Sequence, residues 1–420
     1  MPRILFYKTR KNANSLASLV GAIEQAQGRV SVRTAPQPAL ALPDVSRWSV
    51  DFFGPRGRHL QPPESDELTV LAFSFMSVDA PEIVAALAAL PPQPRAVKIA
   101  GGAHPSGDPE GTLAMGFQHA FAGESEVMLL RFLKGLEAGE VWPPTIRPDH
   151  EPLPLDQFLS FALDENLLAP IELGRGCPFA CRFCHVPQLQ GRRMRHRSVE
   201  SVIEHVEHAL SRGRVRTWFV TSDAFAYGSA RGEQGDARAI ERLLKGCLDA
   251  GMKEVFFGGF PSEVRPDHVQ DELLALVAKY CANRTIVIGA QSGAEEVLVR
   301  LQRGHGAAVV LSAVRKVRAH GLVPHVDFIL GLPGETLDER RRTMDTVEEI
   351  AGSHGGKVHM HYFMPHPGTP YAGSTPEPIE DEIVARVEVL TGKQQVDGYW
   401  RRQRLVAART NPAVLGWYRG

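Results

Sequence analysis

Cysteine is scarce in this sequence: the chain has 5 in 420 residues, and none of them lies before residue 177. So few and so unevenly placed thiols exclude the disulfide framework that holds small secreted domains together. Long apolar runs are also missing, because no stretch approaches the roughly 18 residues that span a membrane. The first residues continue directly into an apolar segment and leave no room for a secretory leader. These absences predict a cytoplasmic protein with no membrane partner.

Net charge is nearly absent as well, at −1, so the chain lacks the basic surplus of DNA-binding proteins and no DNA partner is expected. The most basic run is 192–197. A solvated loop, or cations for the carboxylate or phosphate of a cofactor, explains this run better than nucleic-acid binding does. What remains is an ordinary globular composition, 43% hydrophobic and 23% charged, with length enough for two domains.

Three of the cysteines stand together in one short loop. Cys177, Cys181 and Cys184 have Cys-x3-Cys-x2-Cys spacing. Each iron of a [4Fe–4S] cluster takes one terminal ligand, usually a thiolate, so three thiolates on one loop would leave the fourth iron open. A structural zinc site usually takes four protein ligands, would have to add His185, and is the weaker alternative.

Residues 1–140 alternate between apolar strand patterns and helical spacing. The expected strands are 3–7, 29–33, 68–75, 96–100 and 118–122. The expected helices are 14–27, 80–90 and 125–138. This alternation predicts an α/β fold with a doubly wound, flavodoxin-like (Rossmann-type) parallel sheet. Ligands of such sheets bind beyond the carboxyl ends of the strands, and the loops there are rich in small and polar residues.

Residues 141–165 read as a Pro-rich linker, after which the alternation resumes through residues 166–375. The expected strands are 170–174, 216–221, 254–258, 285–289, 324–330 and 357–363. The expected helices are 198–212, 236–250, 267–281, 294–302, 307–320 and 336–351. Six βα units predict a partial (β/α)6 barrel with its site at the carboxyl ends of the strands. Residues 376–420 are expected to form a short C-terminal helical extension, with helices at 378–390 and 397–407.

The three-cysteine loop, with an aromatic residue before its last cysteine, resembles the cluster-binding loop of the radical S-adenosylmethionine (SAM) superfamily. The resemblance implies a [4Fe–4S] cluster on Cys177, Cys181 and Cys184, which would be both metal ligands and catalytic residues. SAM would chelate the open iron. An electron from the cluster, supplied by an external donor such as flavodoxin or ferredoxin, would cleave SAM to methionine and a 5′-deoxyadenosyl radical.

The ends of the predicted barrel strands resemble a cobalamin-dependent subgroup of the same superfamily. The residues that the resemblance assigns to SAM are Phe183, Ser222, Gln291, Ser292 and Arg303. The residues that it assigns to substrate are Asp223, Glu263, Arg265 and Asp327. Any one of them could instead be a buried polar group that only satisfies its neighbours, and Arg265 could simply pair with Glu263.

The loops of the first domain resemble the cobalamin-binding domain that precedes many radical SAM domains. The residues assigned to cobalamin are Ser74, Phe75, Met76, Ser77, Gly101, Gly102, Ala103, His104, Gly123 and Glu124. The Asp-x-His-x-x-Gly loop, which gives cobalt an axial His in many cobalamin proteins, is absent from residues 8–14. The resemblance therefore implies base-off cobalamin without a His ligand, with Met76 a candidate neighbour of cobalt. A sheet that serves only as a docking domain is the alternative.

These resemblances cover about residues 1–370 and imply a cobalamin-dependent radical SAM enzyme. The interpretation that fits best is a methyltransferase that moves a methyl group from SAM, by way of methylcobalamin, to an unactivated carbon of a small-molecule substrate radical. A cobalamin-using rearrangement or oxidation without methylation stays open. A methylthiotransferase would need a second cluster, and residues 1–176 contain no Cys to bind one. A plain iron–sulfur carrier would need neither an open iron nor a second cofactor domain.

Overall fold

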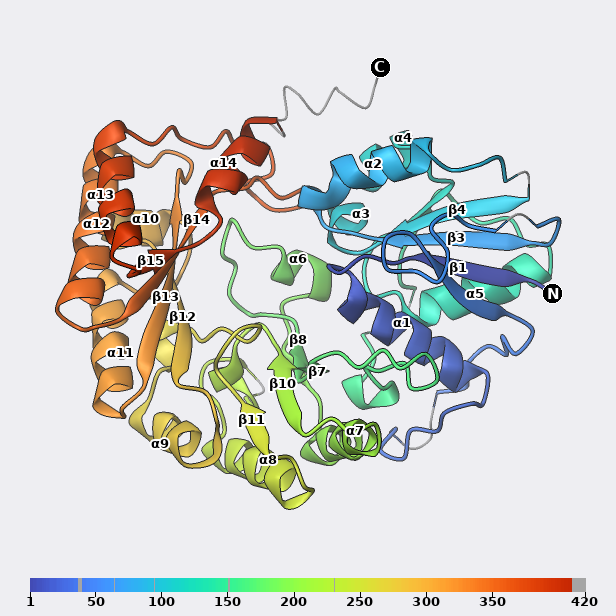
Figure 1. Cartoon of the computed structure of the whole chain (residues 1–420), viewed down its shortest axis with the longest axis horizontal. Helices are drawn as coiled ribbons and strands as arrows, with labels where there is room; N and C mark the ends of the chain where they lie inside the picture. Colours follow the sequence, from blue (N-terminus) through green and yellow to red (C-terminus); the bar gives the residue numbers. More distant parts are fainter. Residues whose placement is uncertain (37–39, 64, 94, 150–151, 230, 410–420) are drawn as a thin grey trace.

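The computed structural model describes residues 1–36, 40–63, 65–93, 95–149, 152–229 and 231–409. The chain folds into two α/β halves that lie side by side, an N-terminal sheet with its helices and a curved array of parallel strands (Figure 1). Residues 150–151 of the expected linker and 410–420 of the expected tail lie outside the described residues. Among the described helices, none is both long and apolar enough to cross a bilayer.

The N-terminal sheet is parallel throughout, with strand order β2-β1-β3-β4-β5-β6. Its strands are β1 (Arg3–Tyr7), β2 (Ser49–Phe53), β3 (Thr69–Ser74), β4 (Ala96–Gly101), β5 (His119–Phe121) and β6 (Thr145–Ile146). The order reverses between β1 and β3, which is the flavodoxin-like pattern that the sequence predicts. A ligand of such a sheet binds beyond the carboxyl ends of the strands at this reversal.

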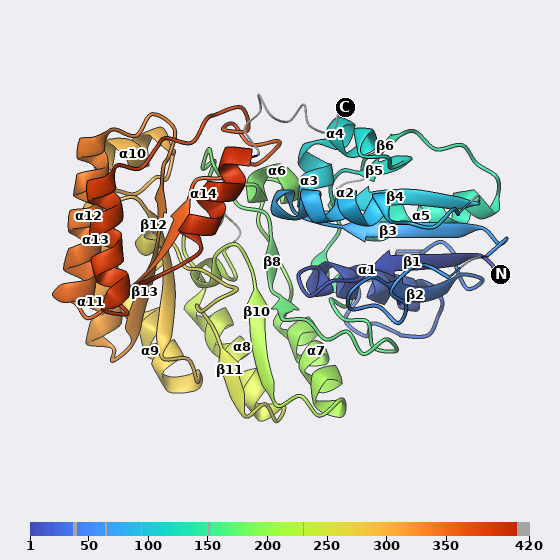
Figure 2. The ribbon, with the colours of Figure 1, turned by 45° about the horizontal axis from the view of Figure 1, so that its top comes forward.

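Helices cover both faces of this sheet (Figure 2). They are α1 (Ala13–Ala26) and α5 (Glu126–Glu137) on one face, and α2 (Ala80–Ala88), α3 (Ala103–Gly107) and α4 (Pro109–Ala114) on the other. Because successive strand residues point to opposite faces, Ile4 and Phe6 join the core under α1 and α5, while Leu5 and Tyr7 join the core under α2. A strand buried on both faces explains the unbroken apolar run at the start of the sequence.

The strand predicted at 29–33 is wrong, and its place in the sheet is taken by β2, which lies in the Pro-rich stretch that follows. Val30 and Val32 pack against the core of the second half. The N–H of Arg33 donates to the buried Glu204 carboxylate of that half at 2.8 Å. The alternating valines therefore belong to a segment that contacts the second half, through apolar packing and through a hydrogen bond to Glu204.

Six parallel strands in chain order form the open barrel of the second half. They are β7 (Ile171–Glu172), β10 (Arg216–Val220), β11 (Glu254–Phe256), β12 (Thr285–Gln291), β13 (Val323–Leu330) and β14 (Lys357–Tyr362). The first three pair as one sheet and the last three as another. A parallel bridge between Val264 and Ile288 joins the two sheets. The C-terminal extension is not purely helical, because β15 (Val396–Asp397) pairs with β14 and adds a strand to the array.

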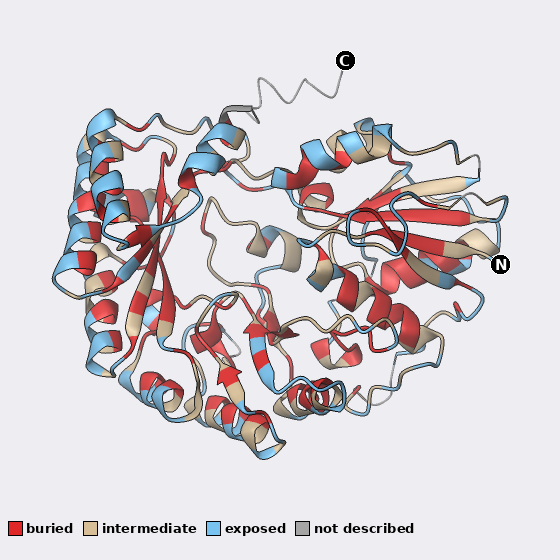
Figure 3. Cartoon of the chain, in the orientation of Figure 1, coloured by how far each residue is buried: buried red, intermediate tan, exposed pale blue. Residues whose placement is uncertain are grey.

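Helices pack on the outside of this array, and buried residues concentrate between them and the strands (Figure 3). These helices are α7 (Val199–Ser211), α8 (Ala237–Asp249), α9 (Asp271–Tyr280), α10 (Glu295–Arg300), α11 (Ala307–Ala319), α12 (Leu337–Gly352), α13 (Asp381–Gly392) and α14 (Trp400–Arg409). On β13, Val326, Phe328 and Leu330 are fully buried in the core. The alternate positions, His325 and Asp327, belong to the opposite face of the strand. The inner face of the open barrel is consequently polar.

The segment expected as a linker is a packed joint between the halves. It contributes β6 to the first sheet, and Phe161 within it is buried. The N–H of Leu163 donates to the Glu24 carboxylate of α1 at 2.7 Å. The joint lies so close to α1 that a Cβ on Gly21 would sit 2.1 Å from the Phe161 carbonyl oxygen. Close backbone packing of this kind fixes the first sheet against the barrel.

Candidate functional site

The three-cysteine loop begins where the first barrel strand ends. β7 is followed by β8 (Gly174–Arg175), which pairs antiparallel with β9 (Arg195–His196) and closes the intervening loop. Gly176 has φ +88°, and a Cβ there would lie 2.2 Å from the Arg193 carbonyl oxygen. Only glycine fits this turn. The loop therefore lies at the carboxyl end of the barrel strands, where the sequence predicts the site.

The cysteine thiols are buried or half-buried. Burial raises the pKa of the Cys177 thiol and raises that of Cys184 to about 12. Polar groups nevertheless point at the sulfurs. The N–H of Val186 donates to Cys184 Sγ at 3.4 Å, and the Arg303 guanidinium donates to Cys181 Sγ at 3.2 Å. Hydrogen-bond donors aimed at buried sulfur suit metal-bound thiolates, so this donor set fits an iron–sulfur cluster.

His185 would be the fourth ligand of the alternative zinc site. Its Nε2 contacts the carbonyl oxygen of Pro367, and its ring lies 4.9 Å from the ring of His366. This contact involves only one of the two ring nitrogens, so the choice between the two sites rests on the three sulfur ligands of the loop. Three ligands favour a cluster with one open iron over a closed zinc site.

Two predicted SAM residues, Gln291 and Arg303, meet a predicted substrate residue, Glu263, at Gly289 of β12. A Cβ on Gly289 would lie 2.8 Å from Gln291 Nε2, 3.3 Å from Glu263 Oε2 and 3.6 Å from Arg303 Nη2. Gln291 has φ +76°, a strained conformation that persists where the surroundings impose it and that clusters at functional sites. Because Arg303 also contacts the cysteine loop, these side chains form one continuous polar surface beside that loop.

The other predicted SAM residues have different surroundings. Ser222 Oγ donates to the Gly176 carbonyl at 2.8 Å, at the edge of the cysteine loop. Ser292 is fully buried, and its hydroxyl is hydrogen-bonded to Thr343 of α12 at 3.0 Å, which ties the segment between β12 and α10 to α12. Phe183 packs against an apolar cluster of the barrel. A role in binding SAM stays a prediction for each of them.

Two of the predicted substrate residues have protein partners. Asp223 Oδ2 is hydrogen-bonded to His268 Nδ1 at 2.6 Å, with both side chains buried. The Arg265 guanidinium lies 3.4 Å from the centre of the Phe179 ring, on the cysteine loop. Arg265 forms its ion pair with Asp267 at 3.0 Å, so the simple Arg265–Glu263 pair is not formed. Arg265 therefore reaches the cysteine loop through an aromatic contact.

Asp327 and Glu263 form a carboxyl pair on the inner face of the barrel. Burial and the neighbouring Glu263 carboxyl raise the pKa of Asp327 to about 9. Burial also raises the pKa of Glu263. Two carboxyls in this position hold a proton at neutral pH, because two like charges this close disfavour each other. The pair can donate one hydrogen bond to a polar substrate and accept another.

A cleft of about 290 Å³ lies at the carboxyl edge of the first sheet, where that sheet faces the barrel. Five predicted cobalamin residues line it: Ser74, Gly102, Ala103, Gly123 and Glu124. The opposite wall includes Pro170 and Val220 from the barrel and Leu189 and Gln190 from α6 (Val186–Gln190). Because α6 directly follows the last cysteine, the cleft extends from the first sheet to the neighbourhood of the cysteine loop.

The remaining predicted cobalamin residues lie around this cleft. Phe75 and His104 are buried and stack with ring centres 5.4 Å apart, and His104 Nδ1 is hydrogen-bonded to Ser77 at 3.1 Å. Burial lowers the pKa of His104 to about 4, and within the described residues its Nε2 has no partner. Gly101 lines an adjoining apolar slot. Met76 is half exposed and is not part of the cleft lining, so its place near cobalt stays a prediction.

Small side chains dominate the wall of the cleft on the side of the first sheet. Ser15 and Ser18 of α1 and Ser106 of α3, which the sequence analysis missed, join the predicted glycines and alanine there. Gly102 has φ +99°, and a Cβ on it would lie 3.0 Å from the backbone nitrogen of Phe75. A wall of this kind lets a large flat group lie against the backbone, which fits a corrin ring. Ser15 and Ser18 are three residues apart on α1, so they lie on the same face of that helix.

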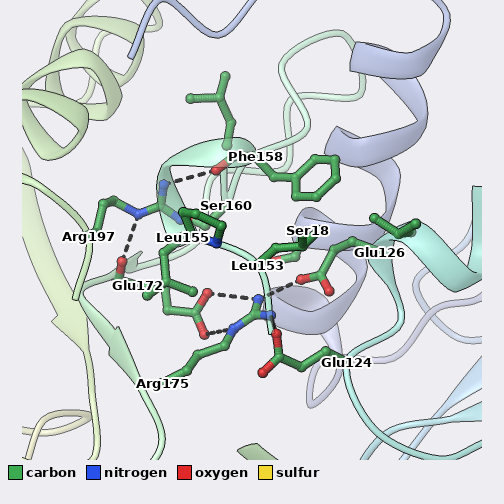
Figure 4. A pocket seen from close by; sticks show the side chains of 13 residues that line it. Ser18, Glu124, Glu126, Leu153, Leu155, Phe158, Ser160, Glu172, Arg175 and Arg197 are labelled. Carbon is green, nitrogen blue, oxygen red and sulfur yellow. Dashed lines mark hydrogen bonds and ion pairs between the residues drawn. The ribbon is translucent and has the colours of Figure 1, made fainter. Parts of the chain in front are cut away.

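Arg175, missed from the sequence, lines the cleft and connects the two halves (Figure 4). Arg195, from the basic run 192–197, reinforces this connection. Arg175 donates to Glu124 at 3.1 Å, to Glu126 at 2.5 Å and to Glu172 at 2.8 Å. Arg195 also donates to Glu124, at 3.2 Å. The Glu124 carboxylate is thus already paired with two guanidinium groups. The signal in the sequence was Arg175 between two glycines, directly before the cysteines.

Comparison with known proteins agrees with this arrangement. Residues 171–347, within the barrel half, match the model of the Radical SAM superfamily. A ribosomal protein uS12 methylthiotransferase from Heliobacterium modesticaldum is 26% identical over 72% of this chain and 65% of its own length. A tRNA-2-methylthio-N(6)-dimethylallyladenosine synthase from Paenarthrobacter aurescens is 29% identical over 59% of this chain and 45% of its own length. The chain thus spans about half to two thirds of these relatives.

Solved structures resemble both halves together. The radical SAM methyltransferase TsrM from Kitasatospora setae, solved with cobalamin and a [4Fe–4S] cluster, superposes with TM-score 0.60 at 14% identity over 89% of this chain and 74% of its own. The cobalamin-dependent SAM radical enzyme OxsB, solved with aqua-cobalamin, superposes with TM-score 0.60 at 15% identity over 94% of this chain and 62% of its own. The fold, a flavodoxin-like domain followed by a partial barrel, is therefore that of these enzymes.

Proposed function

We propose that this chain is a cobalamin-dependent radical SAM methyltransferase that methylates an unactivated carbon of a small molecule. One observation carries the proposal: the small-residue edge of the first sheet lines the same cleft as α6, the helix that begins two residues after the last cysteine of the loop. A methyl donor and a radical source must both reach one substrate carbon, and two cofactor sites on one cleft meet that requirement.

In the barrel half, Cys177, Cys181 and Cys184 would hold the cluster. When bound, the cluster and SAM supply a radical strong enough to remove hydrogen from an unactivated carbon. Arg303 would stabilise the thiolate of Cys181 and extend a cationic edge along β12 toward the carboxylate of SAM. Gln291, held at positive φ, would present its amide to the same ligand.

In the first half, Ser74, Gly102, Ala103 and Gly123 would hold cobalamin, which supplies a methyl group bound to cobalt. The apolar slot beside the cleft shares Ser74 and Gly102 with it and continues between β3, β4 and the helices α1 and α5. A base-off cofactor must place its detached base away from cobalt, and we assign the base to this slot. The neutral His104, with a buried and unpartnered Nε2 in the described structure, offers a hydrogen bond to an amide of the corrin rim.

Asp327 and Glu263 would face the substrate. Their shared proton lets them bind a hydroxyl, amine or carbonyl without a full charge in the barrel. A non-methylating rearrangement or oxidation would use the same groups. A methylthiotransferase, the activity in the names of the relatives, would need further cluster ligands, and the chain has no Cys before residue 177.

The test is an anaerobic assay of the reconstituted chain with SAM, a strong reductant and a panel of small molecules, with and without cobalamin. We expect 5′-deoxyadenosine in both cases, and S-adenosylhomocysteine only when cobalamin is present. With an accepted substrate, the two should form in a ratio of about one to one per methylated product, as the two-SAM scheme requires.

Other outcomes identify the rivals. Product at full rate without S-adenosylhomocysteine would replace methylation by rearrangement or oxidation. A product that contains new sulfur would support methylthiotransfer. Cobalamin that neither binds nor changes any product would reduce the first half to a docking domain.

A further inference from the structure

The inner face of the barrel carries a second cluster of potential ligands, separate from the cysteine loop. His325 lies on β13 two residues before Asp327, and His359 lies on β14 opposite Asp327. Asp397 of β15 lies opposite His359 in the parallel register. Three neighbouring strands, the last from the C-terminal extension, therefore bring two imidazoles and a carboxylate to one place.

The donor atoms of these residues are close enough to share one ion. One ligand atom from each of the three lies within 4.8 Å of the others. His359 Nδ1 is 2.5 Å and His325 Nε2 is 3.6 Å from the same Asp397 oxygen. Both histidines are half-buried. In the described part of the chain, His325 Nε2 is buried without a hydrogen-bond partner, and its contact with Asp397 at 3.6 Å is longer than a hydrogen bond.

Further groups surround the cluster and would orient it. The His361 ring lies 4.6 Å from the His359 ring, and Gln403 of α14 is hydrogen-bonded to His361 Nδ1 at 3.3 Å. Tyr399 meets the His359 ring edge-on at 5.7 Å. Supporting contacts of this kind fix the rotamers of metal-ligating histidines.

We propose that His325, His359 and Asp397 bind one divalent transition-metal ion, of which Zn²⁺ is the simplest representative. Imidazole nitrogen and carboxylate oxygen are normal ligands of Zn²⁺, and two histidines with one carboxylate leave coordination positions open. The alternative to a metal site is a simple hydrogen bond between His359 and Asp397, with His325 close to them by chance. That alternative leaves the buried His325 nitrogen with only the long 3.6 Å contact to Asp397, whereas an ion satisfies all three groups.

His325 also lines an open pocket of about 420 Å³, and an open coordination position on that side of the ion would face this pocket. Its other wall contains Trp218 and Phe256, stacked face to face with ring centres 4.7 Å apart. A small molecule with a carboxylate or hydroxyl on the ion and a flat apolar part on the rings would fit both features. The ion would then act as a Lewis acid that anchors and polarises the ligand oxygen. This inference does not depend on cobalamin or on methyl transfer.

The experiment uses the full chain with its iron–sulfur cluster reconstituted, so that the three cysteines are occupied. The protein is incubated with ZnCl₂ alone and desalted, and zinc and iron are measured together by mass spectrometry. We expect about one Zn²⁺ per chain in addition to the iron, and a zinc absorption-edge spectrum with nitrogen and oxygen neighbours near 2.0–2.1 Å and none of the longer sulfur distance near 2.3 Å.

Variants assign the site. H325A and H359A should each weaken Zn²⁺ binding at least about tenfold, and D397N, at an exposed position, should do so without a folding risk. D397E, which keeps the carboxylate, should retain the ion. H354A is the matched control, because His354 pairs with Glu349 at 3.3 Å elsewhere on the barrel half and should leave binding unchanged. Equal zinc in wild type and in the H325A/H359A double variant, or a sulfur-dominated spectrum, would overturn the proposal.

Discussion

The edge of the first sheet and the inner face of the barrel differ in what their side chains offer. At the edge, Ser74, Gly102, Ala103 and Gly123 form a wall of small groups. In the barrel, Glu263, Gln291, Arg303 and Asp327 crowd together. His325 stands two residues before Asp327 on β13, and His359 stands opposite Asp327 on β14. Both regions lie on parallel strands, yet one surface is nearly bare backbone and the other is dense with ionisable groups.

The difference fits the ligands that we propose for the two regions. A bare wall gains contact area by letting a large, rigid group approach the main chain, and it contributes little chemistry of its own. A wall of charged and hydrogen-bonding groups can orient a small ligand and adjust its charge. The first half therefore suits a cofactor that carries its own reactivity, and the second suits SAM and substrate.

The largest expected effect is on the cluster. The triple variant C177A/C181A/C184A should lose the roughly four irons and four sulfides of the reconstituted protein, because no other thiols lie on this loop. The variant should therefore form no 5′-deoxyadenosine. Iron and sulfide analysis and product chromatography give the readout.

The matched control is C247A. It removes a thiol of α8 that is buried in the hydrophobic core of the barrel half, away from the cysteine loop, and it should keep both the cluster and the activity. A triple variant that still forms 5′-deoxyadenosine would contradict the assignment of the loop.

The next prediction adds one methyl group to the wall of small residues at the edge of the first sheet, at Gly102. G102A should lower cobalamin affinity at least about fivefold, since overpacking typically costs about 1–3 kcal/mol and the new Cβ would lie 3.0 Å from backbone atoms of the wall. G116A is the control, because Gly116 also has positive φ, +105°, but a Cβ there meets nothing within 4 Å. Equal cobalamin affinity in both variants, measured by absorbance titration, would mean that the wall does not hold the cofactor.

The junction between the two regions should lose stability when its central cation is removed. R175M leaves the Glu124, Glu126 and Glu172 carboxylates without their shared partner, and breaking such a buried network costs about 3–5 kcal/mol. R131M, which removes an exposed pair with Asp149, should cost less than about 1 kcal/mol. Denaturant titration compares them. Similar losses in both variants would show that the network does not couple the halves.

The smallest expected effect is a change in pH dependence. The folded-state pKa of Asp327, about 9, lies above its ordinary value of 3.8, so the folded state binds the extra proton and loses stability as pH rises through this window. D327N cannot lose that proton. Its free energy of unfolding should therefore fall less than that of wild type between pH 6 and 9, by at least about 1 kcal/mol, since one pKa unit corresponds to about 1.4 kcal/mol. Parallel pH curves for wild type and D327N, with exposed D338N as reference, would contradict the raised pKa.

The sequence predicts those parts of the molecule that depend on local pattern. The cysteine spacing and the six barrel strands lie within short motifs, as do Gln291 at the end of β12 and Arg303 after α10. β2 was missed because SVDFF carries an aspartate in mid-strand and follows a Pro-rich stretch, while Val30 and Val32 alternated convincingly but pack elsewhere.

Contacts between distant segments could not be read from local pattern. The partner of Ser292, Thr343, lies 51 residues away, and the acceptors of Arg175 in the first half lie 49 and 51 residues before it. The His325, His359 and Asp397 cluster likewise spans three strands, each with one ordinary-looking polar residue. Such sets become visible only when strand register is known.

The central claim is that two cofactor sites border one cleft. Electron paramagnetic resonance of cob(II)alamin bound to the reconstituted chain tests it directly, with the cluster either oxidised or reduced. We predict that reducing the cluster broadens the cob(II)alamin signal through spin–spin interaction, and that the triple cysteine variant shows no such change. A cob(II)alamin spectrum that is identical in both states, with cobalamin and cluster each bound at full stoichiometry, would contradict the account.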